Sequence, residues 1–288
     1  MTEAEFDSIV RSRQGIAAAL SIEEKFNVVL ENFREYELEL LSIAQSRLVF
    51  SQNDWSRIQD DIHTVNRRLM NLLSAIRLFL DHVDRELHEL YGPQSIPAQV
   101  FSEERGKEYD GRLSFRTMEA IRNYTQHRSF PVHELSFLLS ADTDGNNRHV
   151  RHTITPSLSV ASLQADPKFK KSVAAELKPI GKMVQITPMI REYVESIGRI
   201  HVKTRSLMAA DVETWDATME QAVGRGKAFF GDDLGIALVR IEGQDEEETW
   251  TSTTDLFVDS IHRRRYLQGR SSHAEALARH YVSSKPNP

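Results

Sequence analysis

The chain contains no cysteine among its 288 residues. This excludes disulfide bonds, thiolate metal ligands and cysteine nucleophiles, and it favours a reducing compartment such as the cytoplasm. No apolar run approaches the length of about 20 residues that a membrane-spanning helix needs. The first residues, MTEAEFDSIV, are acidic and lack a basic start followed by an apolar stretch. We therefore expect a cytoplasmic protein without a signal peptide and without a membrane partner.

Net positive charge is also missing. Lysine and arginine total 36 against 42 aspartate and glutamate residues, which gives a formal net charge of −6. Proteins that coat nucleic acid are usually basic overall, so contact with RNA would have to come from a local basic patch. The 40% of apolar residues are sufficient for a core, and 288 residues correspond to one large domain or two smaller ones.

Helical periodicity dominates the first third of the chain. Apolar residues recur at helical spacing over residues 21–50 and 54–91, which predicts two long helices. The sequence Ser21-Ile-Glu-Glu24 is typical of a helix start, where the two side chains cap the backbone reciprocally. A short turn joins the two helices, so we expect them to pack antiparallel. Residues 92–110, interrupted by proline and glycine, are predicted to be a linker.

The pattern changes after residue 132. Alternation and β-branched residues predict a hairpin over 133–163 and a second strand pair at 236–242 and 248–253, separated by an acidic turn. Because isolated hairpins are marginal in water, we expect both pairs to join one antiparallel sheet. Further helices are predicted at 166–179, 188–208, 211–230, 254–268 and 273–282.

These patterns predict a mainly α fold with a smaller α+β part. We expect an antiparallel helical bundle over residues 1–132 and an accessory α+β domain of unknown role, with an antiparallel sheet and helices, over residues 133–288. The chain shows no zinc pattern, nucleophile elbow or paired carboxylates at catalytic spacing, so we expect neither a metal site nor a cofactor.

The best candidate for a functional site lies on a third predicted helix, residues 111–128, and reads Arg122-Asn-Tyr-Thr-Gln-His127. Histidine can take or carry a proton near neutral pH. Arginine can hold a phosphate and stabilise charge that develops on it. Asparagine, here Asn123, can hold a ribose hydroxyl or a phosphate oxygen. None of these roles needs a metal ion, so the motif is consistent with metal-independent cleavage of RNA.

A helical projection supports a polar face around this motif. At about 100° per residue, the side chains within about 60° of Asn123 are Arg112, Arg116, Glu119, Gln126 and His127. Arg122 lies at the edge of this face. Tyr124 lies on the apolar side, and we expect it to be a core residue. An ordinary solvated face is an alternative interpretation of the same pattern.

The spacing by itself is not specific. Arg77 with His82 and Arg128 with His133 have the same separation as the motif pair. However, His82 lies in the middle of a long helix, and His133 lies beyond the proline that is expected to end the motif helix.

At these residues the chain resembles the HEPN superfamily of small helical domains. Many members are metal-independent ribonucleases of toxin–antitoxin, abortive-infection and CRISPR-linked systems. The family pattern is an arginine, an adjacent polar residue and a histidine a few positions later, which Arg122, Asn123 and His127 match. Two long helices before the motif helix are also similar, so the resemblance covers roughly residues 20–130.

The resemblance implies a metal-independent endoribonuclease in a toxin or phage-defence setting. It implies a homodimer in which the motif helices meet, so that both copies of Arg122 and His127 form one composite site. Asn123 would position the ribose or phosphate. Three further residues on this face are predicted to bind substrate: Arg116, Gln126 and Arg112. The expected partners are RNA, a second copy of the chain, and an antitoxin or other regulatory protein.

A non-catalytic HEPN-like dimer is the alternative prediction. The helical part would then be a binding platform or scaffold, and the α+β part would sense a ligand or hold a partner. An enzyme needs Arg122 and His127 exposed in one cleft, whereas a scaffold does not, so the face of the motif helix discriminates between the two.

Overall fold

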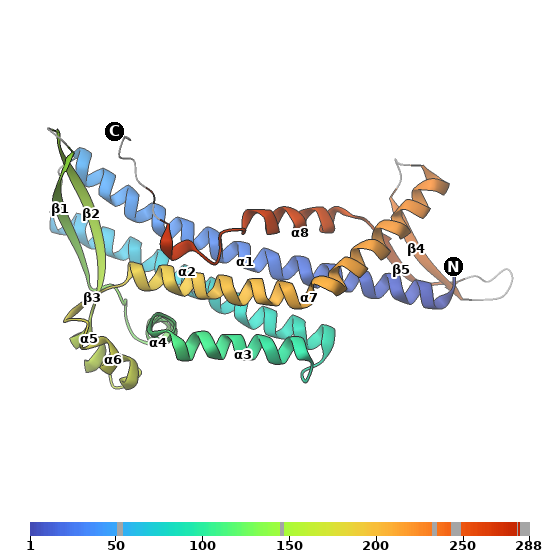
Figure 1. Ribbon diagram of the computed structural model, residues 1–288, viewed down its shortest axis with the longest axis horizontal. Helices are drawn as coiled ribbons and strands as arrows, with labels where there is room; N and C mark the ends of the chain where they lie inside the picture. The colour runs from blue at the N-terminus through green and yellow to red at the C-terminus, as the bar shows by residue number, and fades with distance from the viewer. Residues whose placement is uncertain (51–53, 145–146, 232–234, 243–248, 281, 283–288) are drawn as a thin grey trace. The chain divides into compact units, whose positions relative to one another are not determined.

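The computed structural model of the chain describes residues 1–50, 54–144, 147–231, 235–242, 249–280 and 282. Over these residues the fold is mainly α-helical with two small antiparallel sheets, which confirms the predicted fold class (Figure 1). The helices are α1 (Glu3–Phe50), α2 (Trp55–Tyr91), α3 (Ile96–Gly111), α4 (Leu113–His127), α5 (Val160–Ala165), α6 (Lys171–Leu177), α7 (Thr187–Phe230) and α8 (Asp259–Arg270), followed by a 3₁₀ turn, Leu277–Arg279. The strands are β1 (Glu134–Asp144), β2 (Asn147–Ser159), β3 (Met183–Gln185), β4 (Ile236–Glu242) and β5 (Thr249–Leu256). Within their described residues, none of the helices has a stretch both apolar and long enough to cross a membrane.

The start of α1 differs from the prediction. The helix begins at Glu3 rather than near Ser21. The Ser21 hydroxyl lies 2.8 Å from Nε2 of His82, so it serves a tertiary contact instead of capping a helix. Ahead of it, Ile9 and Ile16 are buried in a cluster with residues of α7 and β5. This packing stabilises helical turns that local signals did not indicate.

Two other predictions about helix boundaries were also wrong. The segment expected to be a linker forms α3, because Pro97 lies in its first turn, where proline is tolerated. α7 is continuous across the break predicted at residues 209–210. Asp211, which was expected to begin a new helix, accepts a hydrogen bond from the Tyr91 hydroxyl at 2.8 Å. Its side chain is therefore used in packing and not as a helix cap.

The strands form two sheets, which corrects the prediction of a single one. β1 and β2 form a hairpin, and β3 pairs with the last residues of β2, Ser157 opposite Gln185. β4 and β5 pair with each other. Ile236 and Leu256 of this second hairpin pack on buried residues of α1 and α7, so helices stabilise it in place of the other sheet. The acidic turn predicted between β4 and β5 lies outside the described residues.

The chain divides into two compact units. Unit 1 comprises Met1–Asn27, His82–Gln99 and Lys203–Ser272, and unit 2 comprises Val28–Asp81, Val100–Val202 and His273–Pro288. Each unit therefore takes residues from both sides of position 132, where the sequence predicted a domain boundary. α4 belongs to unit 2, and the candidate site consists of residues of that unit.

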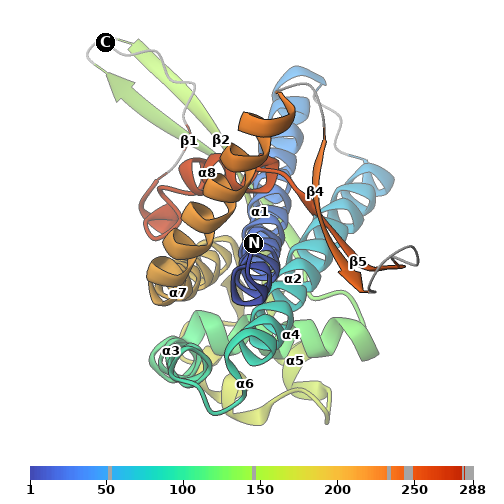
Figure 2. The same cartoon turned by 90° about the vertical axis from the view of Figure 1, so that its right-hand side faces the viewer.

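Within unit 2, α4 is held from two directions. α5 and α6 lie beside it, as Figures 1 and 2 show. Behind it, the buried Asn66 of α2 binds the backbone of Val132. Its Nδ2 donates to the Val132 carbonyl at 3.1 Å, and its Oδ1 accepts from the Val132 N–H at 2.9 Å. The chain that leaves the motif helix is therefore fixed to α2 before it enters β1.

Candidate functional site

The sequence of α4 divides the helix into a buried and an exposed side. Its buried residues are Ser114, Phe115, Thr117, Met118, Ala120 and Ile121. On the predicted polar face, the exposed residues are Asn123, Gln126 and His127, and the partly buried ones are Arg112, Arg116 and Glu119. Tyr124, expected in the core, is partly exposed, and its ring lies edge-on to Phe169 with centroids 6.0 Å apart. Tyr124 therefore lies at the border between the two sides.

A pocket of about 760 Å³ opens on the polar face of α4. One wall comes from α4, with Arg116, Glu119, Ala120, Asn123, Tyr124 and His127. Positions three and four residues apart share one side of a helix, which is why these residues line the same wall. The remaining lining residues come from α3, the end of α4 and the segment before α6: Tyr109, Arg128, Lys168, Phe169 and Lys170. The pocket thus combines the predicted Asn123 and His127 with four cationic side chains.

His127 is exposed at this pocket. Its ring forms no hydrogen bond or ion pair with any residue that the structure describes. Both ring nitrogens are therefore available to exchange a proton with a ligand in the pocket, which a general acid or base requires.

The histidines of the competing pairs are engaged in the fold. His82 is buried, and its Nδ1 lies 2.8 Å from Nη2 of Arg85. Arginine can only donate, so Nδ1 accepts and Nε2 carries the proton directed at Ser21. His82 therefore cannot act as a base toward Ser21, and burial lowers its pKa. His133 accepts a backbone hydrogen bond at 3.3 Å, and burial lowers its pKa as well.

Arg122 does not line the pocket and is only partly exposed. Its Nη1 donates to Oδ1 of Asn123 at 3.2 Å, and its Nε is buried without a partner among the described residues. At about 100° per residue, the five positions between Arg122 and His127 turn them about 140° apart around the helix. One copy of the chain therefore does not bring both residues into this pocket.

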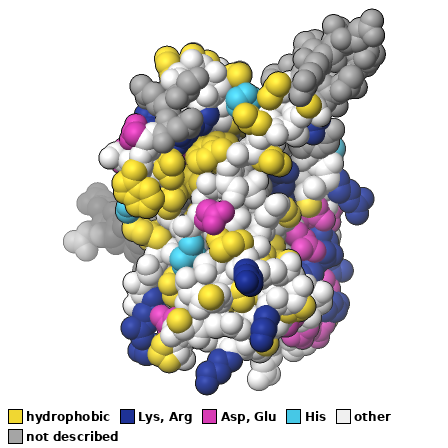
Figure 3. Space-filling model, turned by 90° about the vertical axis from the view of Figure 1, so that its left-hand side faces the viewer, with side chains coloured by type: hydrophobic (Ala, Val, Ile, Leu, Met, Phe, Trp, Pro, Cys, Tyr) yellow, Lys and Arg dark blue, Asp and Glu magenta, His cyan; other side chains and the backbone are white. Residues whose placement is uncertain are grey.

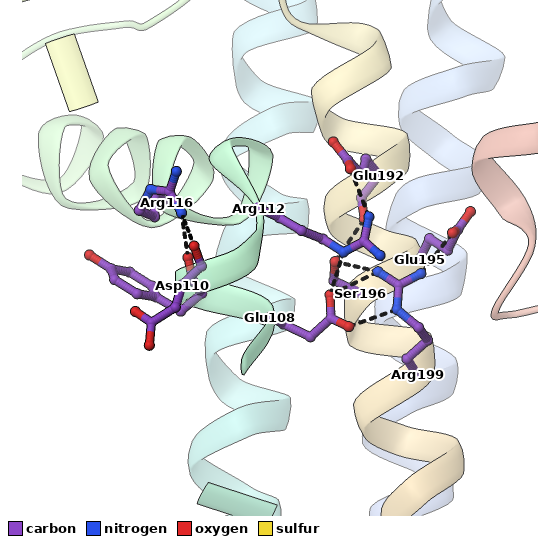
Figure 4. A network of polar contacts seen from close by, with 9 residues as sticks. Glu108, Asp110, Arg112, Arg116, Glu192, Glu195, Ser196 and Arg199 are labelled. Atoms are coloured by element: carbon purple, nitrogen blue, oxygen red, sulfur yellow. Dashed lines mark hydrogen bonds and ion pairs between the residues drawn. The ribbon is translucent and has the colours of Figure 1, made fainter. Parts of the chain in front are cut away.

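Arg112 belongs to an ion-pair network that joins α3 and α4 to α7 (Figure 4). Its Nε lies 2.9 Å from Oε2 of Glu108, and its Nη1 lies 2.8 Å from Oε1 of Glu192. Arg199 of α7 binds the same Glu108 through two hydrogen bonds, at 2.7 and 2.8 Å. Burial, the largest single effect, would raise the pKa of Glu108, but the hydrogen bonds from Arg199 and Ser196 and the charges of Arg199 and Arg112 together outweigh it and lower the pKa. Arg112 thus positions the start of α4, and its charge is already paired inside the chain.

Arg116 lines the pocket but is also paired. Its Nη2 lies 2.5 Å from Oε2 of Glu176. Its Nη1 donates to the carbonyls of Tyr109 and Asp110, at 2.9 and 2.6 Å, in the last turn of α3, where carbonyls lack helical partners (Figure 4). Gln126 is exposed and does not line the pocket. Of the three predicted substrate-binding residues, only Arg116 lies at the pocket.

Three cationic residues at the pocket were not predicted: Arg128, Lys168 and Lys170. The two lysines lie far along the chain from α4, so helical periodicity could not relate them to the motif. The one local signal is the order Lys168-Phe169-Lys170. Phe169 is buried and the lysines on either side are exposed, as expected when an apolar side chain turns inward between two charges.

Across the positions that the structure describes, no three histidine, aspartate or glutamate side chains are grouped so that they could hold a metal ion. Comparison with models of protein families, with curated proteins and with solved structures finds no match for the chain. The chemistry of the site is therefore what indicates the function of the chain.

Proposed function

We propose that the chain is a metal-independent endoribonuclease of the HEPN type, acting as a homodimer with a composite active site. His127 carries the proposal, because it is exposed, without a partner among the described residues, at a pocket with Asn123 and four cationic side chains. A general base must reach its substrate, and cations are suited to the phosphates of RNA. By the same resemblance we propose a cytoplasmic role as a toxin or in phage defence, restrained by an antitoxin or other regulatory protein.

In the proposed reaction, His127 removes the proton from a ribose 2′-hydroxyl. The 2′-oxygen attacks the adjacent phosphorus, and the bond from phosphorus to the 5′-oxygen of the next nucleotide breaks. That oxygen takes a proton from a second donor, which leaves a 2′,3′-cyclic phosphate and a 5′-hydroxyl end. Asn123 would hold the ribose or the phosphate. The wall of one pocket contains neither a second histidine nor Arg122, so a donor and a charge-stabilising group must come from elsewhere.

A second copy of the chain would supply the missing groups. In a two-fold dimer, His127 and Arg122 of both copies can share one cleft. Exposed apolar residues of unit 2 support self-association. Leu38, Leu41 and Leu48 of α1 are 55, 48 and 59% exposed, and their spacing places them on one side of the helix. Figure 3 shows apolar side chains gathered on the face that carries the β1–β2 hairpin, and such exposed patches mark interaction surfaces.

The test is an RNA-cleavage assay in the presence of a metal chelator. We expect the wild type to cleave single-stranded RNA and to leave 2′,3′-cyclic ends. His127→Ala should lower the rate by about 10²- to 10⁴-fold, because proton transfer is lost. Arg122→Ala should lower it by about 10²- to 10³-fold, because the charge that develops on the phosphate loses its stabilisation. His88→Ala, which removes an exposed histidine of α2 outside the pocket, should cleave like the wild type.

Circular dichroism should show the same helical content in all variants, so that a loss of activity is not a loss of fold. Cleavage that requires added magnesium contradicts the proposal, and so does a His127→Ala variant that cleaves as fast as the wild type.

A non-catalytic dimeric binding protein is the second candidate. The position of Arg122 favours it, because this side chain is partly buried, hydrogen-bonded to Asn123 and absent from the pocket wall. The same samples discriminate between the two functions. A binding protein would retain RNA on a filter in chelator without shortening it, and His127→Ala would not change that result.

A further inference from the structure

The segment before α6 lines the pocket together with α4. Phe169 is 5% exposed, so its ring fixes the segment to the core. Asp166 orders the backbone further, since its carboxylate accepts the Lys168 N–H at 2.8 Å and its carbonyl accepts the Phe169 N–H at 3.2 Å. The two exposed lysines beside Phe169 are therefore presented from a backbone that is already ordered.

The cations of the pocket differ in what compensates their charge. Arg116 is paired with Glu176, and Nε of Arg128 lies 3.5 Å from Oδ2 of Asp166. Lys168 and Lys170 have no carboxylate partner in the described part of the chain. These two ammonium groups are thus the ones that a phosphate could neutralise without breaking an existing ion pair.

The carboxylate among the residues that line the pocket is also hydrogen-bonded within the chain. Oε1 of Glu119 accepts a hydrogen bond from the Tyr193 hydroxyl at 2.6 Å. Burial, and next the charge of Glu119, raise the pKa of Tyr193, which keeps this hydroxyl protonated and donating. Glu119 is therefore held at one side of the pocket by a neutral donor.

Aromatic rings lie next to the uncompensated lysines. The Lys170 ammonium lies 4.9 Å from the centre of the Tyr109 ring and donates to its hydroxyl. Tyr124 is partly exposed, one helical turn before His127, and lines the same pocket. Sites for single-stranded nucleic acid typically combine cationic side chains that bind the phosphate backbone with aromatic rings on which bases stack.

We propose that Lys168 and Lys170 bind the phosphate of a nucleotide in single-stranded RNA, and that Tyr124 stacks on its base. This subsite rests on the proposed RNA substrate, and it adds specificity residues from outside the motif helix. It would hold the strand in the pocket so that the neighbouring ribose reaches His127. The ligand class is a single strand, because a base paired in a duplex does not offer its face to a tyrosine.

The test is fluorescence anisotropy with a labelled oligouridine in which every 2′-hydroxyl is methylated, so that it binds but cannot be cleaved. Lys168→Gln/Lys170→Gln should weaken binding at least about tenfold. It should also reduce the slope of the logarithm of the binding constant against the logarithm of the salt concentration by about 0.7, since the lost contact with one phosphate of a single strand removes about that much. Tyr124→Leu should weaken binding about fivefold or more with an unchanged salt slope, because a stacked base is lost without a charge.

Two controls distinguish binding at this site from nonspecific attraction between lysines and the negatively charged strand. Lys171→Gln/Lys178→Gln removes the same charge from exposed lysines of α6 and its end that do not line the pocket. This variant should bind within about twofold of the wild type and keep most of its salt slope. A duplex of the same sequence should bind more weakly than the single strand.

The outcomes distinguish this inference from the ribonuclease proposal. If the wild type cleaves RNA but the Lys168→Gln/Lys170→Gln variant binds the probe like the wild type, the subsite is wrong and the enzyme stands. If binding depends on the two lysines but no sample cleaves RNA, the subsite stands and the chain is a binding protein. A wild type that fails to bind the probe, or both lysine pairs weakening binding equally, overturns the subsite.

Discussion

Asn66 fixes the path of the chain after α4 through its side chain. It is fully buried and forms two hydrogen bonds with the backbone of Val132. Asn66→Ala would leave a buried N–H and a buried carbonyl unpaired, each at about 1–3 kcal/mol. We therefore expect the free energy of unfolding to fall by about 2–4 kcal/mol in urea denaturation.

Asn32→Ala is the matched control for this residue. The Asn32 amide donates to the carbonyl of Val28 in its own helix at 2.8 Å, at a partly exposed position, so little should be lost. Equal effects of the two substitutions would show that the buried contact with Val132 contributes no special stability.

At the scale of the element, the packing of α7 can be tested through two of its glycines. A methyl group at Gly198 would overlap the backbone carbonyl of Ala274, whereas one at Gly224 would meet nothing within 4 Å. Gly198→Ala should lower the free energy of unfolding by about 1–3 kcal/mol, because backbone must move to relieve the overlap. Gly224→Ala should raise it by about 0.5–1 kcal/mol, since alanine is the better helix former.

Thermal denaturation of the two variants beside the wild type measures this difference. The two substitutions are the same chemical change in one helix, so helix propensity is common to both. A Gly198→Ala variant as stable as Gly224→Ala would contradict the close approach of α7 and the segment around Ala274.

At the scale of the whole molecule, the proposed dimer makes a prediction about mass and activity together. Light scattering at micromolar concentration should give twice the mass of one chain. Leu41→Lys/Leu48→Lys places charges on the exposed apolar side of α1 and should dissociate the dimer. Cleavage should be lost with the dimer, because the composite site needs both copies.

A wild type that is a monomer at this concentration would contradict the dimer. A dissociated variant that still cleaves RNA would contradict the composite site instead. Arg34→Lys, a charge-conserving change at an exposed position of α1, should leave both the mass and the activity unchanged.

The stability of the molecule should also depend on pH through two histidines. The pKa values of His82 and His133 are lowered, mainly by burial. The unfolded chain then binds protons at these sites at a higher pH than the folded chain. Above the unfolded pKa of about 6.5 the two histidines are neutral in both the folded and the unfolded chain. Below it, the free energy of unfolding falls as the pH falls.

Urea denaturation at about pH 7.5 and about pH 5.5 brackets this transition. We expect the wild type to be less stable at the lower pH, and the loss to be smaller in His82→Gln/His133→Gln. His88→Gln, which changes an exposed histidine, should lose as much stability as the wild type. A double variant that also loses as much would show that other groups cause the pH dependence. Glu108, whose pKa is lowered, loses its contribution only below its usual value of 4.5, outside this window.

The sequence by itself determined the local features of this protein. It predicted α2 and α4 to within two residues and the exposure of Asn123 and His127, because helical spacing, glycine and proline act within a few turns. It placed the start of α1 at Ser21 and a break before Asp211, because serine and aspartate commonly cap the starts of helices. Both side chains instead bond to distant residues, His82 and Tyr91, and the sequence does not reveal these partners.

Only the tertiary structure decided which charges are free and where the pocket lies. On the helix alone, Arg112 and Arg116 resemble available cations, but Glu192 and Glu176 pair with them from segments far along the chain. The two lysines beside Phe169 show no relation to the motif in the sequence, yet they line its pocket. The physical reason is that ion pairs and cavities depend on how distant segments pack, whereas periodicity reports only which side of one helix a residue occupies.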